Sequence, residues 1–284
     1  MNVERFLSLQ NYRPRTIETY RLILTGVNAW CIERGLTPET IQPEDFDEYL
    51  LSKRTTAYRR LILTCVKSYL HVMAPTAPLT RKKSITATPP TEMRTVGKED
   101  AAVVIAYLWA NRNRKSYKRT LAMFLLSWEA GLRATEIVEL TLKALNLESC
   151  VATVLRKGGK KVTGCPFSPT AAATIKAYMQ IRPSGCERVF VTDEGKPMDR
   201  NAWRLCLLRL ARVAGVEHFS PHALRRGGSV EMMLNGAPDE VIMRLYGWSD
   251  HALLSRYTMA ATMERARQWL PTAGLPLPVE MEAA

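Results

Sequence analysis

The sequence predicts a mainly α-helical fold with a small β-hairpin, of the α+β class, divided into two domains. Apolar residues recur every three to four positions along most of the chain, which is the spacing of amphipathic helices. Two short strand-like segments flank Gly158 and Gly159, a pair typical of hairpin turns. A proline-rich stretch separates two helical regions, and a length of 284 residues favours more than one domain.

Residues 1–73 are expected to form a small helical bundle. Its helices are predicted over residues 16–34, after Pro43, and over residues 54–72. Gly35 is placed to end the first of these helices. The third helix carries Arg59, Arg60 and Lys67 on its polar face, and contact with DNA explains these cations about as well as an ordinary solvated face does.

Residues 74–95 are predicted to be an extended linker, because this stretch is rich in proline, threonine and alanine. Arg81, Lys82 and Lys83 are consecutive within it. A linker that joins two modules on one duplex would cross the phosphate backbone, so these cations are candidate DNA contacts. Solubility is the alternative explanation for them.

Residues 96–270 are expected to form a second, larger domain, followed by a tail at 271–284. Its helices are predicted over residues 98–110, 117–130, 169–180 and 201–213, with three more punctuated by Gly236 and Gly247. Strands are predicted over residues 151–155, 161–165 and 189–191. Arg133 follows Gly131 and opens a further short helix.

The composition excludes several classes of protein. Hydrophobic residues make up 46% of the chain and charged residues 24%, which is ordinary for a globular protein. No apolar run approaches the roughly 18 residues of a membrane span, and no signal peptide is recognisable. The six cysteines show neither a Cys-x-x-Cys pattern nor a Cys/His cluster, which argues against a disulfide framework or a zinc site. A cytoplasmic protein without a metal is the resulting expectation.

The charge of the chain suggests a polyanionic partner. The formal net charge is +13 and the pI is near 9.6, and neutralising phosphates would release their condensed counterions. The surplus is dense around the linker, since residues 74–98 carry five lysines and arginines against one acidic residue. Charge alone is weak evidence, because many basic proteins bind no specific partner.

The most informative residues are a His-x-x-Arg pair, His222 and Arg225, with Tyr257 later in the same stretch. Two earlier segments add Arg133, in AGLRATEI, and Lys157, in VLRKGGKKV. Ionising a tyrosine at pH 7 costs roughly 4 kcal/mol, so its use as a nucleophile requires nearby cations or a base. Arginines suit an anionic phosphodiester, and a lysine can protonate a leaving oxygen. These residue types indicate cleavage of a phosphodiester without a metal.

Each of these residues also has an ordinary structural explanation. Arg133 could pair with Glu136, and a tyrosine near a helix end packs more often than it reacts. Gly227 and Gly228, however, lie one turn into a predicted helix, where each costs about 1 kcal/mol of helix propensity. Their placement suggests that backbone or a ligand approaches closely there. Arg226 adds a further positive charge beside Arg225 and His222, a clustering that favours a bound anion.

The order of these residues, together with Gly247-Trp248 nine positions before Tyr257, resembles the tyrosine recombinase (phage integrase) family. The resemblance covers both domains, with residues 1–73 similar to the family's core-binding domain and residues 96–270 to its catalytic domain. It implies six catalytic residues, namely Arg133, Lys157, His222, Arg225, Trp248 and Tyr257. The implied activity is site-specific DNA recombination through a covalent 3′-phosphotyrosine intermediate.

The resemblance also implies a role for each residue. Tyr257 would attack the scissile phosphate and release a 5′-hydroxyl, which a second strand's 5′-hydroxyl can reverse. Arg133 and Arg225 would hold the non-bridging oxygens. Lys157 would protonate the leaving oxygen, and His222 would assist proton transfer. No ATP, other cofactor or obligatory metal is implied, because the covalent link conserves the bond energy.

Four further residues are assigned on the same basis. Trp248 would contact the phosphate or pack beneath the nucleophile's helix, and it stands where many members carry a histidine. Glu136 would steady Arg133. Lys160 remains a rival to Lys157, because the hairpin is one residue longer than the common pattern. Tyr246, just before the Gly-Trp pair, is expected in the core.

The partner implied is a double-stranded DNA recombination site, bound by a tetramer whose tails, residues 271–284, dock on neighbouring protomers. The predicted DNA contacts are Arg59, Arg60, Arg81, Lys82 and Lys83. The location implied is cytoplasmic and nucleoid-associated. Two other functions use the same residues or charge: a type IB topoisomerase-like DNA relaxase, and a non-catalytic DNA-binding regulator that kept the fold.

Overall fold

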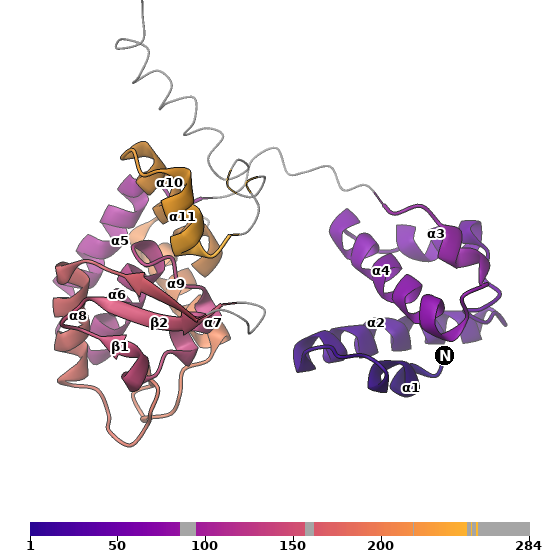
Figure 1. Ribbon diagram of the computed structural model, residues 1–284, viewed down its shortest axis with the longest axis horizontal. Coiled ribbons are helices and arrows are strands. Elements are labelled where there is room, and N and C mark those ends of the chain that lie inside the picture. The colour runs from indigo at the N-terminus through magenta and orange to yellow at the C-terminus, as the bar shows by residue number, and fades with distance from the viewer. Residues whose placement is uncertain (86–94, 157–161, 218, 249–250, 252–253, 255–284) are drawn as a thin grey trace, which may run out of the picture. The chain divides into compact units, whose positions relative to one another are not determined.

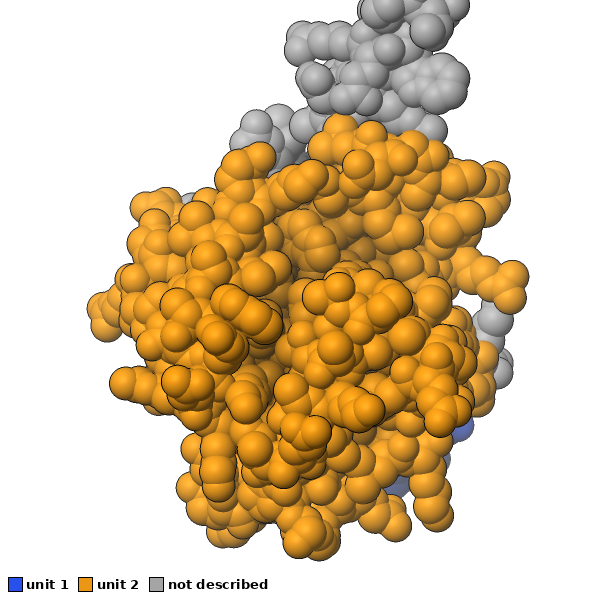
Figure 2. All heavy atoms as spheres, turned by 90° about the vertical axis from the view of Figure 1, so that its left-hand side faces the viewer, with its two compact units in different colours: residues 1–91 blue, residues 92–284 orange. Residues whose placement is uncertain are grey.

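The computed structural model describes residues 1–85, 95–156, 162–217, 219–248, 251 and 254 (Figure 1). The chain divides into two compact units, residues 1–91 and residues 92–284, which are coloured separately in Figure 2. Each unit has its own apolar core. The roles expected for residues 1–73 as a core-binding domain, 74–95 as a linker and 96–270 as a catalytic domain stay predictions.

The first unit is an all-helical bundle. Its elements are α1 (Val3–Ser8), α2 (Pro14–Glu33), α3 (Pro43–Leu51), α4 (Thr56–Met73) and the 3-10 helix η1 (Pro78–Arg81). Helices α2 and α3 begin with proline, whose missing N–H is not needed in the first turn. The Thr55 side chain caps α4 by accepting a hydrogen bond from the Tyr58 N–H. The predicted helices over residues 16–34 and 54–72 are present, each displaced by one or two residues.

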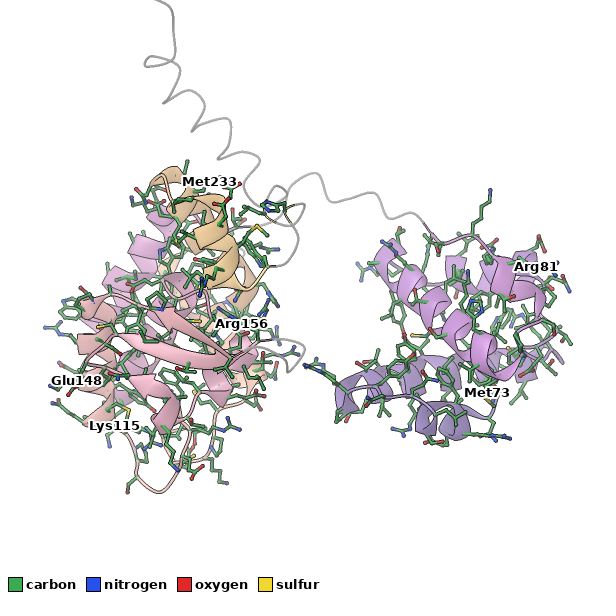
Figure 3. All side chains as sticks on the ribbon, viewed as in Figure 1. Met73, Arg81, Lys115, Glu148, Arg156 and Met233 are labelled. Atoms are coloured by element: carbon green, nitrogen blue, oxygen red, sulfur yellow. The ribbon has the colours of Figure 1, made fainter. Side chains whose placement is uncertain are left out.

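Part of the predicted linker is folded onto the first unit instead of being extended. Ala77 and Leu79, around η1, are buried in the core of the bundle. Just after η1, the Lys82 ammonium lies 2.6 Å from Asp47 Oδ2 and donates a hydrogen bond to the Pro43 carbonyl at 2.9 Å. The prolines predict an extended chain, but Pro78 instead begins a single 3-10 turn, and the apolar residues Ala77 and Leu79 complete the core. Arg81 remains exposed (Figure 3).

In the second unit, helices pack against one face of a small antiparallel sheet. Its elements are α5 (Lys98–Ala110), α6 (Lys115–Trp128), α7 (Ala134–Glu139), η2 (Leu142–Ala144), β1 (Leu145–Asn146), β2 (Val151–Leu155), β3 (Val162–Pro166), α8 (Pro169–Met179), α9 (Arg200–Ala214), α10 (Pro221–Leu234) and α11 (Asp239–Tyr246). The strand order is β1-β2-β3, with Thr153 opposite Gly164 in the hairpin. The mainly helical α+β class and the predicted hairpin are confirmed.

One predicted strand is wrong. Within residues 189–191 only Val191 forms a bridge, opposite Pro197, and the neighbouring Arg188 forms another isolated bridge with Thr141. The three residues Val189, Phe190 and Val191 are fully buried, so their apolar run reflects core packing and not membership of the sheet. Of the three helices predicted around Gly236 and Gly247, the last falls outside the described residues.

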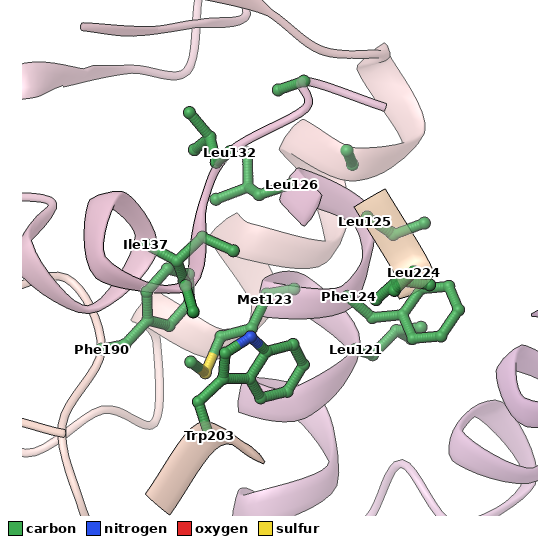
Figure 4. Close-up of a cluster of buried hydrophobic side chains, with 14 of the residues drawn as sticks. Leu121, Met123, Phe124, Leu125, Leu126, Leu132, Ile137, Phe190, Trp203 and Leu224 are labelled. Carbon is green, nitrogen blue, oxygen red and sulfur yellow. The ribbon is translucent and has the colours of Figure 1, made fainter. Parts of the chain in front are cut away.

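Helix α6 forms the centre of the second core. It buries nearly its whole length, including Leu121, Met123 and Phe124 (Figure 4). Trp203 of α9 and Leu224 of α10 pack into the same cluster. Because α10 is held against α6 in this way, the residues in the first turns of α10 have a fixed position relative to the α6–α7 connection.

Gly227 and Gly228 are required by the contact between α10 and α6. A Cβ atom on Gly227 would lie 2.2 Å from the Val96 carbonyl oxygen, and one on Gly228 would lie 2.2 Å from the Trp128 carbonyl oxygen. Real side chains do not approach backbone so closely. The structure therefore confirms the close approach expected of this pair, and the approaching group is backbone.

Among the described residues, no helix is long and apolar enough to cross a membrane. All six cysteines are free thiols.

Candidate active site

Arg133 is fixed at the start of α7 by Glu136. The Arg133 backbone N–H donates to Glu136 Oε2 at 2.8 Å, while its guanidinium Nη1 donates to Glu136 Oε1 at 2.8 Å. The sequence AGLRATEI thus folds so that an acidic residue in the first turn of the helix holds the side chain that precedes it. Glu136 is buried and Arg133 keeps about a fifth of its side chain exposed, which leaves the guanidinium accessible.

Arg225 lies one turn into α10 and points into the protein. Ser220 caps this helix through the Ala223 N–H at 3.1 Å, which sets the helical phase of the residues that follow. The Arg225 guanidinium donates hydrogen bonds to the carbonyls of Gly131 and Tyr246. Burial, followed by the nearby charge of Arg133, lowers the pKa of Arg225 to about 9, so the group still carries its charge at neutral pH.

The C-terminal end of α11 is the point where three arginines meet. Three consecutive carbonyls there accept hydrogen bonds from three different guanidiniums: Leu245 from Arg156, Tyr246 from Arg225, and Gly247 from Arg133 at 3.1 Å. The last carbonyls of a helix lack partners within the helix and lie at the negative end of its dipole, so cations are stabilised there. Three arginines from segments distant in sequence thereby bind the three backbone carbonyls that immediately precede Trp248.

Arg156 was not anticipated from the sequence. It follows β2 directly and lies at the end of that strand (Figure 3), with only 7% of its surface exposed. Its Nη1 lies 2.7 Å from Glu136 Oε2. The sequence pattern could have indicated that Arg156 is buried: Ala152 and Val154 face the core, and the two-residue period of a strand places residue 156 on the same side. An arginine there needs a buried anionic partner.

The cluster carries a surplus of positive charge. Three guanidiniums, those of Arg133, Arg156 and Arg225, share the single carboxylate of Glu136, which gives a net charge of +2. Arg225 Nη1 is 3.8 Å from Glu136 Oε2, too far for a hydrogen bond. Buried charges of one sign repel one another strongly in a medium of low polarisability. Binding an anion beside Arg133 and Arg225 would relieve that repulsion.

His222 occupies the first turn of α10, three residues before Arg225. Its pKa is lowered by desolvation and by the positive charges of Arg225, Arg226, Arg133 and Arg200. At neutral pH the imidazole is therefore uncharged and able to accept a proton.

Trp248 packs instead of standing free. It is half-buried, and its ring lies 5.3 Å from the ring of Tyr246. Both belong to a small apolar cluster with Met233, Ile242 and Leu254. Tyr246 itself is fully buried and donates its hydroxyl hydrogen to the Trp128 carbonyl at 2.8 Å, which confirms it as a core residue.

The structure brings together Arg133, Arg225, Trp248 and, at the N-terminal turn of α10, His222. Lys157, its rival Lys160 and Tyr257 lie outside the described residues. Among those that are described, no group of three or more His, Cys, Asp or Glu could hold a metal ion.

The candidate DNA contacts of the first unit fall into two groups. Arg59 and Lys82 are used inside the unit, Arg59 by donating to the carbonyls of Lys53 and Leu51 at 2.7 and 3.1 Å. The sequence did not reveal these bonds, because the acceptors are backbone carbonyls, which no side-chain pattern marks, and a carboxylate 35 residues from Lys82. Exposed cations are found at Arg60, Arg81 and Lys83.

Comparison with known proteins extends these observations. The model of the phage integrase family matches residues 101–264. Tyrosine recombinase XerD of Yersinia pestis is 26% identical over 291 residues, covering 94% of each chain. XerD of Vibrio cholerae is 33% identical over 158 residues, about half of each chain.

Solved structures share the fold. The XerH site-specific recombinase bound to a palindromic difH substrate has a TM-score of 0.75 at 13% identity, covering 91% of this chain and 80% of that one. The Tn1549 transposon integrase in complex with transposon right end DNA has a TM-score of 0.73 at 16% identity, covering 94% of this chain and all of that one.

Proposed function

This chain belongs to the phage integrase family and is a tyrosine-type site-specific DNA recombinase; we propose that Tyr257 is its nucleophile and that Arg133, Arg225, Lys157 and His222 serve the strand transfer. DNA is its partner. The proposal rests above all on one observation: Arg133 and Arg225 converge on the end of α11, leaving a net positive charge at the residues that directly precede Trp248, which is nine positions before Tyr257 in the sequence.

In the proposed reaction, the Tyr257 phenolic oxygen forms a bond to the scissile phosphorus while the bond from phosphorus to the 5′-oxygen breaks. The phenolic proton passes to the neutral imidazole of His222. Lys157 gives a proton to the departing 5′-oxygen, which leaves as a hydroxyl. The product is a 3′-phosphotyrosine, and attack on it by a 5′-hydroxyl from another strand reverses these steps and joins new partners.

Arg133 and Arg225 are proposed to bind the non-bridging oxygens of the phosphate. Negative charge grows on these oxygens as the fifth bond to phosphorus forms, and preorganised guanidiniums stabilise it without reorganising. Removing one such donor typically costs a factor of about 10² to 10³ in rate. Trp248 is proposed to pack beneath the nucleophile's segment, which is supported by its contact cluster with Leu254.

The nucleophile is tested with a nicked duplex whose sequence is first defined by footprinting on DNA flanking the gene. The wild-type protein should give a covalent adduct that shifts on a denaturing gel. Tyr257→Phe should abolish the adduct and leave DNA binding intact, because only one oxygen is removed.

Tyr246→Phe is the matched control, since Tyr246 is the nearest alternative phenol and its hydroxyl is already bonded to Trp128. Adduct should persist in Tyr246→Phe. Adduct that persists in Tyr257→Phe would overturn the assignment of the nucleophile.

The assembly and DNA contacts are further parts of the proposal. We propose a tetramer on DNA in which residues 271–284 dock on a neighbouring protomer, and residues 1–73 act as the core-binding domain. Exposed Arg60, Arg81 and Lys83 are proposed to contact phosphates. Arg59 and Lys82 are proposed to contribute less, because the Lys53 carbonyl and the Asp47 carboxylate already bind them. Such a protein would act in the cytoplasm, associated with the nucleoid.

A further inference from the structure

Arg156 has features that its place at the end of a strand does not explain. It is 93% buried, and its guanidinium contacts groups from three separate segments: Glu136 of α7, Cys165 of β3 and the Leu245 carbonyl at the end of α11. Cys165 Sγ accepts from Nη2 at 3.0 Å. Nε has no hydrogen-bond partner among the described residues. A buried arginine with one unmet donor is costly to stability, so its placement calls for another benefit.

The bond to Glu136 decides how the carboxylate is shared. Oε1 is taken by the Arg133 guanidinium, while Oε2 accepts from the Arg133 N–H at 2.8 Å and from Arg156 Nη1 at 2.7 Å. Arg225 Nη1 stays 3.8 Å from the same Oε2. Because Arg156 occupies this oxygen, Arg225 donates its hydrogen bonds to the Gly131 and Tyr246 carbonyls and makes only a longer ion pair, without a hydrogen bond, to Glu136.

The bond to Leu245 fixes the other side of the same arrangement. Arg156 binds the first of three carbonyls whose successors hold Arg225 and Arg133. The absence of a side chain at Gly247 permits this contact, because a Cβ atom there would lie 2.9 Å from Arg156 Nε. The positive φ of 58° at this position also favours glycine. Arg156 is therefore packed against the turn that carries the Gly247 carbonyl.

We propose that Arg156 is a positioning residue for strand transfer: by occupying Glu136 Oε2 and the Leu245 carbonyl, it holds Arg133 and Arg225 apart and leaves their charge available to the scissile phosphate. The inference rests on the proposed function, in which these two arginines bind the non-bridging oxygens. In this proposal Arg156 acts through Glu136 and the Leu245 carbonyl, to which its guanidinium donates, and not by contact with the phosphate.

The test compares two duplexes that differ only at the scissile position, one with the ordinary phosphodiester and one with an uncharged methylphosphonate. A neutral linkage needs much less help from cations than an anionic one does. Arg156→Met should slow single-turnover adduct formation on the phosphodiester about 10- to 100-fold, somewhat less than loss of a direct donor. On the methylphosphonate the same variant should come within about threefold of the wild-type protein, as Arg133→Met should too.

Arg119→Met is the matched control. Arg119 is equally buried in the same unit and is paired with Asp193 at 2.7 Å, but it contacts none of the residues at the end of α11. A loss that comes only from weakened folding should be the same on both duplexes, and this is the result expected for Arg119→Met. An equal loss on both duplexes for Arg156→Met would overturn the proposal.

Two further arms keep the outcome clear. Arg156→Lys retains a charge for Glu136 but cannot reach Leu245 at the same time, so it should show a smaller loss that again shrinks on the methylphosphonate; this variant decides the matter if Arg156→Met does not fold. The wild-type protein and Tyr257→Phe report separately on the proposed function. Wild-type adduct that is absent from Tyr257→Phe, together with equal losses for Arg156→Met, would leave that function standing and remove Arg156 from it.

Discussion

At the scale of single residues, the site is built around one carboxylate that is outnumbered by cations. Glu136 contacts Arg133 and Arg156 directly and lies 3.8 Å from Arg225. A protein that needed only stability would match such charges more evenly, since unpaired buried charge is costly. In the proposed reaction, the phosphate bound by Arg133 and Arg225 would balance this excess of positive charge.

Glu136→Gln is predicted to destabilise the second unit strongly. The amide keeps the shape of the side chain but leaves two buried guanidiniums without their counter-charge, and breaking a buried pair costs about 3 kcal/mol or more. Urea unfolding followed by circular dichroism measures the change. Glu231→Gln is the control: Glu231 pairs with the largely exposed Lys98, so its loss should cost about 0.5 kcal/mol. Equal effects of the two changes would contradict this view of the cluster.

His222 is predicted to titrate below its ordinary pKa of 6.5 in the free protein. Desolvation and the arginine charges around it disfavour the imidazolium. The midpoint can be read from the imidazole resonances in a pH titration by NMR, with His222→Gln used to assign the signal. Arg226→Gln removes one of the charges and should move the midpoint upward. A midpoint at or above 6.5 would count against the electrostatic account.

The same shift has a consequence for stability. Between the lowered folded-state pKa and the unfolded value near 6.5, the unfolded chain binds more protons than the folded one. The contribution of His222 is therefore complete above pH 6.5 and is lost as the pH falls through the folded-state pKa. His222→Gln should lose less stability than the wild-type protein between neutral and mildly acidic pH.

At the scale of secondary-structure elements, α10 must lie unusually close to α6 for Arg225 to reach the carbonyls of Gly131 and Tyr246. Gly227 and Gly228 permit that approach. Two helix positions thus carry residues of low helix propensity, and this allows the side chain of Arg225, in the preceding turn, to reach its partners.

Gly228→Ala is predicted to destabilise the second unit by about 2 kcal/mol, because the new methyl group would lie 2.2 Å from the Trp128 carbonyl and 2.7 Å from the Tyr246 hydroxyl oxygen. Calorimetric unfolding measures the loss. Gly26→Ala is the control, since Gly26 is also within a helix but its Cβ would meet only Tyr49 Oη at an ordinary 3.6 Å. That change should be neutral or stabilising by up to about 1 kcal/mol. Similar losses in both variants would argue against close packing as the cause.

The sequence predicted most elements because their signals are local. Helix α5 has the predicted bounds, and the β2–β3 hairpin follows from alternating residues around two glycines. Residues 189–191 misled because an apolar run has the same appearance in a strand and in a buried irregular segment. The fold of η1 onto the bundle depends on Lys82 reaching Asp47, a contact across 35 residues that no local pattern encodes.

The candidate site was predictable only in part for the same reason. The order of Arg133, His222 and Arg225 carries the family resemblance, and local spacing was enough to find them. That Arg133 and Arg225 both bind carbonyls at the end of α11 depends on the tertiary structure. Arg156 was missed because the groups that it binds are 20 and 89 residues away in the sequence. The two-residue period of the strand indicated only that its side chain would face the core.

At the scale of the whole molecule, a net charge of +13 favours binding to DNA, but the structure divides the cations by availability. Those with partners inside the protein, such as Lys82 at Asp47, already have their charge balanced. Those that are exposed, such as Arg81, can exchange water and counterions for phosphates. Affinity and its dependence on salt should therefore follow the second group and not the total count.

The combined variant Arg60→Gln, Arg81→Gln, Lys83→Gln is accordingly predicted to bind duplex DNA more weakly and with a shallower dependence on salt. Each lost phosphate contact should reduce the slope of log K against log [NaCl] by about one unit. Fluorescence anisotropy with a labelled duplex at several NaCl concentrations measures that slope. Lys82→Gln is the matched control from the same segment, and it should leave the slope nearly unchanged because its ammonium is bound to Asp47 and Pro43. If the combined variant kept the wild-type slope, these exposed cations would not face the duplex, and the positive charge that attracts DNA would have to lie on the second unit.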